Sequence, residues 1–208
     1  MLEGHKLNAL PRTFYYIPEF ITPEEEDFLW KHIYNAPIPK WVVLKARRLQ
    51  NWGGIPHPKG MLTEKIPNWL QPFMDRVSSL GIFGENKANH ALVNEYLPGQ
   101  GIFPHHDGPL YYPAVSTINL GSYGVLDFYK PVQDDADEER YIGSVLLEPR
   151  SLNIVTDELY TYYMHGIAEA STDQTSLGPR TRETRISVTI RHVPVVSRLD
   201  VRTLLKKS

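Results

Sequence analysis

The sequence predicts a mainly β protein with helices in its N-terminal part, an α+β fold whose strands form a sandwich or a barrel. Seventeen prolines and fourteen glycines are spread along the 208 residues, which favours many short elements joined by turns. Helix-type patterns occur before about residue 81, and from about residue 91 onward the chain shows short β-type runs at close spacing. A chain of this length is expected to form one core, so we interpret residues 1–208 as a single domain.

The first predicted element is a helix over about residues 23–34. Thr22 suits the N-cap position and Pro23 the first helical position, and Glu25 is placed to reach back and complete a capping box. A second helix is predicted over about residues 68–80, where apolar residues recur on one face and a glycine follows. We interpret this apolar stripe as core packing.

The β-type runs that follow are bounded by Gly, Pro, Asn and Asp. They predict strands at about residues 91–97, 115–120, 124–129, 142–148, 151–156, 161–167 and 185–193. Between them, the acidic run from Asp134 to Glu139 is interpreted as a solvated hairpin loop, and residues 170–184 as a polar connection without apolar periodicity.

Composition limits the classes of function. The net charge of −2 excludes a general basic field, so any contact with nucleic acid must use a local patch. The absence of cysteine excludes disulfides, thiolate zinc sites and a cysteine nucleophile, so a metal must bind to His, Asp and Glu. The longest apolar runs have four residues, and the N-terminus lacks the apolar stretch of a secretory signal. We therefore expect no membrane span and a location in the cytoplasm, the nucleus or both.

A candidate metal site begins at His105 and Asp107. In an extended chain these two side chains point to the same side, whereas His106 points away. A facial triad for non-haem Fe(II) needs one carboxylate and two imidazoles, so a second histidine must come from elsewhere. Downstream of Asp107 the candidates are His165, in an aromatic β-type run, and His192. A lone histidine in such a run is more often structural, and only the neighbouring motifs favour His165 as a ligand.

A candidate carboxylate site follows in the last predicted strand. Arg185, Ser187, Thr189 and Arg191 alternate with apolar residues and therefore share one face. One interpretation is an ordinary strand with its polar face in water. The other is a clamp for a small dicarboxylate, because the planar guanidinium pairs bidentately with a carboxylate and stays charged when partly buried.

Asn94 and Tyr96 also share one face of a predicted strand, where an amide and a phenol could complete such a site or serve only the structure.

The sequence motifs of several other enzyme classes are missing. The chain has no phosphate loop, no Gly-x-Ser-x-Gly turn and no His-Glu-x-x-His helix, and Gly99-Gln-Gly101 continues as a turn instead of a dinucleotide loop.

These motifs follow one another in a specific order: Asn94-x-Tyr96, Pro98-x-x-Gly101, His105-x-Asp107, His165, and Arg185 with Arg191 six residues later. The combination resembles the AlkB family of Fe(II)- and 2-oxoglutarate-dependent dioxygenases over about residues 16–194. The resemblance implies a double-stranded β-helix, or jelly roll, with its core at about residues 91–194 and a helical and lid region at about residues 14–90.

The resemblance also implies site roles. His105, Asp107 and His165 would hold Fe(II), with 2-oxoglutarate and O₂ as cosubstrates. Arg185 would pair with the remote carboxylate of 2-oxoglutarate, and three further residues would complete the pocket: Asn94, Tyr96 and Arg191. Ser187 stands where the family often has asparagine, so a contact of this shorter side chain with the cosubstrate is left open.

The family's reaction is oxidative demethylation of N-alkylated bases in DNA or RNA, giving an aldehyde and a free base. A basic, aromatic stretch with Arg47, Arg48 and Trp52 is either a lid that binds single-stranded or flipped-base nucleic acid or a solvated loop with Trp52 packed inward. Tyr111 and Tyr112 either stack on a flipped base or pack. The alternatives to a nucleic-acid demethylase are a protein side-chain hydroxylase or demethylase and a binding module for modified nucleic acid with little turnover.

Overall fold

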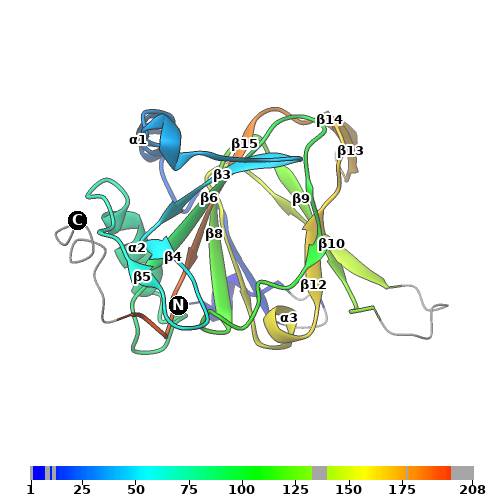
Figure 1. Ribbon diagram of the computed structural model, residues 1–208. Helices are drawn as coiled ribbons and strands as arrows, with labels where there is room; N and C mark the ends of the chain where they lie inside the picture. Colours follow the sequence, from blue (N-terminus) through cyan, green and yellow to red (C-terminus); the bar gives the residue numbers. More distant parts are fainter. Residues whose placement is uncertain (1, 8–9, 11–12, 133–139, 177, 198–208) are drawn as a thin grey trace.

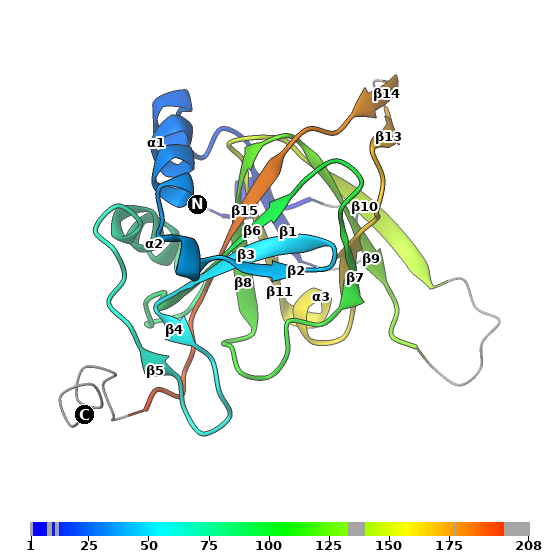
Figure 2. The same ribbon diagram turned by 45° about the horizontal axis from the view of Figure 1, so that its top comes forward.

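Two β-sheets face each other, and two N-terminal helices cover the outer side of the larger sheet (Figures 1 and 2). The computed structural model describes residues 2–7, 10, 13–132, 140–176 and 178–197. The predicted acidic loop at residues 134–139 lies outside these described residues. Within them, no helix combines the length and the apolar character that a membrane crossing requires.

The elements have the following bounds. The helices are α1 (Pro23–Tyr34), α2 (Gln71–Ser78) and α3 (Asp157–Thr161), with short 3₁₀ turns η1 (Glu3–His5) and η2 (Ile38–Lys40). The strands are β1 (Phe14–Ile17), β2 (Val42–Leu44), β3 (Arg47–Trp52), β4 (Gly54–Ile55), β5 (Leu62–Thr63), β6 (His90–Tyr96), β7 (Ile102–His105), β8 (Ala114–Gly121), β9 (Gly124–Tyr129), β10 (Tyr141–Leu147), β11 (Leu152–Thr156), β12 (Met164–Ile167), β13 (Thr172–Thr175), β14 (Gly178–Thr181) and β15 (Arg185–Arg191).

The larger sheet has seven strands in the order β1-β11-β8-β15-β6-β3-β2, and the smaller has four in the order β10-β9-β12-β7. Strand β15 lies in the middle of the larger sheet, antiparallel to β8 on one side and to β6 on the other. Strand β7 is an edge strand of the smaller sheet, and within the described residues it pairs with β12 alone. Because the two sheets face each other, each has an inner face that borders the space between them.

Helix α1 confirms the predicted helix and its start. The Thr22 side chain accepts a hydrogen bond from the Glu25 amide at 3.2 Å, and the Glu25 carboxylate accepts one from the Thr22 amide at 3.0 Å. This capping box satisfies two amide groups that the first helical turn leaves without partners. Glu25 also forms an ion pair with Arg76 of α2, so the residue that caps one helix ties it to the next.

Helix α2 is shorter than predicted, because residues 68–70 form turns in which the amides of Leu70 and Gln71 both donate to the carbonyl of Pro67. Six of the seven predicted strand runs are confirmed within one or two residues. The run at 161–167 is only partly correct, because the strand begins at Met164: Thr161 ends α3, and Tyr162 and Tyr163 connect the two elements. Leu159 and Tyr160 of α3 are buried in the core, so packing favours a helix directly before this strand. The polar connection at 170–184 also contains strands, the β13–β14 hairpin, in which an ion pair joins Arg182 to Asp173.

Two hydrophobic clusters place the core. One lies between the helices and the outer face of the larger sheet, and in it Ile186, Val188 and Ile190 of β15 meet residues of α1 and α2. The other lies between the two sheets. Fully burying an Ile or Leu side chain contributes about 1.5–3 kcal/mol, so the outer cluster fixes which face of β15 points away from the helices. The polar alternate residues of β15 are thereby directed into the interior.

Candidate functional site

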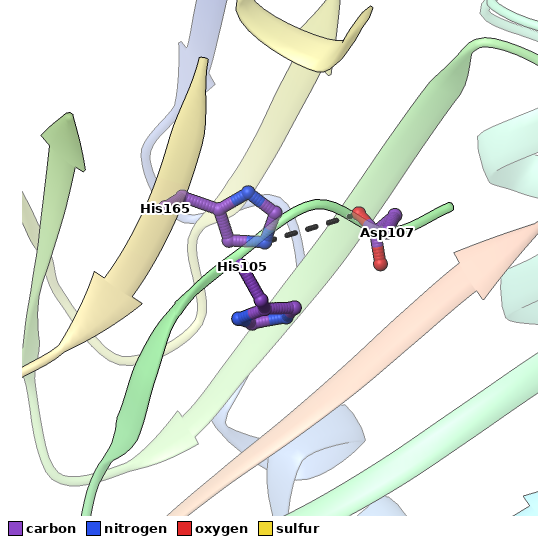
Figure 3. A group of neighbouring side chains, drawn as sticks. All are labelled: His105, Asp107 and His165. Carbon is purple, nitrogen blue, oxygen red and sulfur yellow. Dashed lines mark ion pairs between the residues drawn. The ribbon is translucent and has the colours of Figure 1, made fainter. Parts of the chain in front are cut away.

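The predicted metal ligands converge between the two sheets. His105 ends β7, Asp107 follows two residues later, and His165 lies in β12, directly opposite His105 in the antiparallel pairing. One ligand atom from each of the three lies within 4.8 Å of the others (Figure 3). The other candidate, His192, is used elsewhere: its Nδ1 atom lies 2.7 Å from the carbonyl of Lys87.

The two imidazoles of the triad suit a metal. His105 Nδ1 donates to the carbonyl of Phe103 at 2.8 Å, so Nε2 is the ring atom that can bind a metal. Burial lowers the pKa of His165 to about 4, so this imidazole is neutral near pH 7. His165 Nε2 lies 3.8 Å from Asp107 Oδ2, too far for a hydrogen bond.

Asp107 remains a carboxylate although it is buried. Burial raises its pKa, but the positive charge and the hydrogen bond of Arg191, together with the electrostatic interaction with the two imidazoles, outweigh this, and the pKa lies below its usual value. Arg191 donates a hydrogen bond to Oδ1, whereas the buried Oδ2 has no partner. Asp107 Oδ2, together with the two imidazoles beside it, forms a donor set of two histidines and one carboxylate. Non-haem Fe(II) is commonly bound by this set, so the residues fit this metal.

The triad opens into a cavity of about 510 Å³ between the sheets. The cavity is also lined by seven other residues predicted from the sequence: Arg47, Asn94, Tyr96, Tyr111, Arg185, Ser187 and Arg191. Strand β15 is buried along its whole length, so the interpretation of its polar face as solvent-exposed is wrong. The helices cover one face of the strand, and the cavity lies against the other.

Arg185 lies in this cavity as a buried cation without a carboxylate partner among the described residues. Its Nη2 atom donates to Asn119 Oδ1 at 2.6 Å, while Nε and Nη1 are buried with no partner. Burial lowers its pKa to about 10, so the guanidinium is charged near pH 7. The Tyr96 ring lies beside it, 5.6 Å from ring centroid to Cζ. Two free nitrogen atoms on a charged, planar group are suited to bind a carboxylate.

Arg191 is placed differently from Arg185, although both line the cavity. It pairs with the metal ligand Asp107, and its guanidinium stacks on the Tyr111 ring at 4.5 Å from Cζ to the centroid. Its Nε and Nη1 atoms are also buried without partners. Arg191 therefore contacts the metal triad through Asp107, and its other nitrogen atoms remain available to a ligand in the cavity.

The other residues predicted to bind 2-oxoglutarate line the cavity from neighbouring strands. Asn94 of β6 is paired in register with Ser187 of β15, and both are buried. The Asn94 side-chain oxygen accepts a hydrogen bond from Arg47 Nε at 3.2 Å. Arg47 therefore reaches from β3 toward the group of residues around Arg185.

Adjacent predicted substrate residues point in opposite directions. Arg47 enters the cavity, but Arg48 faces the helices, where it makes two hydrogen bonds of 2.7 Å to Glu95 and stacks on Trp41. This is the alternation of a strand, since residues 47–52 form β3 instead of a loop.

Trp52 and Tyr112 likewise do not line the cavity. Trp52 donates to Gln50 at 3.0 Å and packs edge-on against Trp69, so the inward-packed interpretation describes it. Tyr112 packs edge-on against Phe83 on the helix side, whereas its neighbour Tyr111 lines the cavity.

Sequence reasoning missed several residues that shape this site. Asn119 holds Arg185, and the Tyr160 hydroxyl donates to the carbonyl of Gly108, next to Asp107, at 3.1 Å. Thr117 and Asn153 also line the cavity. The available signal was the alternation of polar residues 117 and 119 with apolar residues 118 and 120 in a predicted strand, which indicates a polar face.

Comparisons with known proteins agree with this geometry. Residues 40–191 match the model of the 2OG-Fe(II) oxygenase superfamily. The chain is similar to the probable RNA/DNA demethylase ALKBH6 of Danio rerio, with 48% identity over 96% of this chain and 94% of the relative. It is also similar to uncharacterized protein L905 of Acanthamoeba polyphaga mimivirus, with 33% identity over 86% and 84% of the two chains.

Solved structures share the fold at low sequence identity. The structure of OsALKBH1 matches with a TM-score of 0.59 and 12% identity, covering 86% of this chain and 96% of that one. A prolyl-4-hydroxylase of Pseudomonas putida matches with a TM-score of 0.54 and 11% identity, covering 86% and 90%. The expected double-stranded β-helix and the stated family resemblance are thereby confirmed. The chain belongs to the 2OG-Fe(II) oxygenase superfamily, as an AlkB-like member with the iron-binding triad His105, Asp107 and His165.

Proposed function

We propose that this protein is an Fe(II)- and 2-oxoglutarate-dependent dioxygenase that oxidatively demethylates N-alkylated bases in DNA or RNA. One observation carries the proposal: the metal triad shares a single cavity with Arg185, a buried cation that has no carboxylate partner among the described residues. The similarity to the relative named as a probable RNA/DNA demethylase supports the choice of substrate.

His105, Asp107 and His165 hold the metal in this proposal. The bound iron and cosubstrates supply the oxidising chemistry. Arg191 keeps Asp107 ionised and occupies its Oδ1 atom, which leaves Oδ2 for the metal. Tyr160 holds the backbone after Asp107 through the carbonyl of Gly108.

The cosubstrate site is proposed at the other end of β15. Arg185 binds one carboxylate of 2-oxoglutarate, and Asn94, Tyr96 and Ser187 line the space between it and the metal. Arg191 faces the same space with two unpartnered nitrogen atoms, which suits the second carboxylate. Apolar surface in the same cavity comes from Leu126, Leu147 and Val155.

Tyr111 and Arg47 are the proposed substrate contacts, since both side chains line the cavity. Tyr111 would stack on a flipped base, and Arg47 would lie at the backbone or the base edge. The helical and lid region at about residues 14–90 and the core at about 91–194 act as one domain in this proposal, because the cavity takes Arg47 from one and the triad from the other. A nucleic-acid substrate agrees with a location in the cytoplasm, the nucleus or both, which is part of this proposal.

The direct test is nucleoside mass spectrometry of single-stranded DNA and RNA that carry mixed N-methyl bases. The protein is incubated with Fe(II), ascorbate and O₂, with and without 2-oxoglutarate, and the Asp107→Ala variant is the control. We expect one methyl mark to disappear only with the wild-type protein and 2-oxoglutarate. Succinate formation without loss of any mark would contradict the nucleic-acid substrate and favour a protein side chain. Binding of methylated strands without succinate would favour the binding module.

A further inference from the structure

Arg185 differs from the two other fully buried arginines of the described residues, Arg182 and Arg191, in the kind of group that holds it. Within the described residues, each of six other arginines forms an ion pair with a carboxylate: Arg48, Arg76, Arg150, Arg180, Arg182 and Arg191. Arg185 is held instead by Asn119, whose neutral amide oxygen accepts from Nη2 at 2.6 Å. The guanidinium is therefore fixed in place without being neutralised.

The orientation of the Asn119 amide is determined by its surroundings. Its nitrogen donates to Asn153 Oδ1 at 3.0 Å and to Ser151 Oγ at 3.1 Å, and all three side chains are buried. The Ser151 hydroxyl donates its own hydrogen to the carbonyl of Glu148 at 2.6 Å, so Oγ can only accept from Asn119. If the amide were reversed, its NH₂ group would face the Arg185 cation and its oxygen would face Ser151 Oγ and Asn153 Oδ1. These contacts therefore keep the oxygen directed at Arg185.

Gly124 provides the space that the Arg185 side chain occupies. A Cβ atom at this position would lie 2.8 Å from Arg185 Nε and 2.9 Å from Cδ, closer than side-chain atoms normally approach. The Tyr96 ring lies beside the same guanidinium. Asn119 and Gly124 together thus favour this position of Arg185, in which Nε and Nη1 have no hydrogen-bond partner among the described residues.

We infer that Asn119 is a positioning residue for 2-oxoglutarate, which holds Arg185 while leaving its charge to the cosubstrate, and that Gly124 makes this position possible. The inference rests on the proposed role of Arg185 as the carboxylate partner. A carboxylate in place of the Asn119 amide would form an ion pair with Arg185 in a buried, low-dielectric environment, and it would compete directly with the cosubstrate. A neutral amide holds the arginine without this competition.

The test measures 2-oxoglutarate binding by isothermal titration calorimetry, with Mn(II) in place of Fe(II) so that no turnover occurs. We expect Asn119→Asp to raise the Kd for 2-oxoglutarate about 100-fold, and Asn119→Ala and Gly124→Ala about tenfold each. The Kd for Mn(II) alone should stay unchanged in all three variants, because none of these positions belongs to the triad. A purely structural role would predict that the isosteric aspartate is milder than alanine.

The matched control is Ser116→Ala. Ser116 lies on the same strand as Asn119 and is equally buried, but its hydroxyl donates to the carbonyl of Ile190 on the helix-covered face. This variant loses one buried hydrogen bond and should keep the wild-type Kd for 2-oxoglutarate.

Wild-type affinity in Asn119→Asp, or a rise in Kd no larger than that of Ser116→Ala, would overturn the inference. If Asn119→Asp does not fold, the same criterion applies to Asn119→Ala and Gly124→Ala. A wild-type protein that binds Mn(II) but not 2-oxoglutarate would instead overturn the proposed function, and the inference with it.

Discussion

The two faces of the seven-stranded sheet differ in how they treat buried polar groups. On the helix-covered face, Glu95 accepts two hydrogen bonds from Arg48 and one of 2.5 Å from Tyr34. On the cavity face of the same sheet, Arg185 and Arg191 keep nitrogen atoms that have no hydrogen-bond partner. Unpartnered buried polar atoms are costly, so their concentration on one face marks it as the face that binds ligands. Changes on the cavity face should therefore affect chemistry, and changes on the helix-covered face should affect stability.

The largest effect is expected for Asp107→Ala on the cavity face. A methyl group cannot replace a charged oxygen ligand, and the loss of the carboxylate also leaves Arg191 without its partner. We expect metal binding to be lost and succinate formation to fall at least about 1,000-fold, as measured by metal titration and a succinate assay. Retained 2-oxoglutarate turnover in a folded variant would show that the triad assignment is wrong.

Arg48→Met tests the opposite face. The substitution leaves Glu95, whose side chain is 5% exposed, without its cation, so we expect a loss of about 3 kcal/mol in the free energy of unfolding. Denaturant titration measures this loss. The double variant Arg48→Met, Glu95→Gln should recover part of it, because the buried charge is then removed. A large fall in kcat of the folded Arg48→Met protein would break the separation between the two faces.

Trp52→Ala sharpens the comparison, because this residue was a candidate for nucleic-acid contact. Its ring packs on Trp69 and carries the Lys40 ammonium 4.6 Å from the centroid, so we expect a stability loss of about 2 kcal/mol. Binding of single-stranded nucleic acid by the folded variant should remain near the wild-type level, as measured by fluorescence anisotropy. Tyr111→Ala on the cavity face is the counterpart that should weaken substrate binding. Weakened nucleic-acid binding in Trp52→Ala, with unchanged binding in Tyr111→Ala, would instead show that Trp52 contacts the substrate.

The smallest effect concerns pH and His90, which lies next to Tyr111 and is buried with its Nδ1 atom unpartnered. Burial and the nearby Arg191 lower its pKa from 6.5 to about 3. A lowered pKa means that the unfolded chain takes up the proton first, so the stabilisation is present above about pH 6.5 and is lost as the pH falls toward 3. Between about pH 7 and pH 5.5 we expect a loss of about 1 kcal/mol that is absent in His90→Gln, measured by denaturant titration at each pH. Equal pH dependence in both proteins would contradict this.

Local signals in the sequence were sufficient for some parts of the structure. The capping box of α1 lies within four consecutive residues, and the pattern of β15 identifies its two faces without knowledge of its neighbours. The pair His105 and Asp107 likewise needs only the alternation of an extended chain. Assigning His165 required the resemblance, since the pairing of β7 with β12 brings it to the site.

The remaining parts depend on which face the helices cover. The sequence predicts a lid or a loop at Arg47 and Arg48 and not the strand β3, in which their side chains point in opposite directions. The packing of α1 determines that Arg48 is the one facing away from the cavity. The hold of Asn119 on Arg185 requires the register of β8 and β15 together, where Asn119 lies opposite Ser187. Such contacts between distant segments leave no local pattern in the chain.

The placement of the triad also affects the mechanical integrity of the fold. His105 lies on the edge strand β7 and His165 on its only neighbour in the sheet, so a bound metal ion would join the ends of a loop of about 60 residues. The ion would act as a cross-link that keeps an edge strand in place, in addition to its role in the reaction. Loss of metal would thus loosen the wall of the cavity itself.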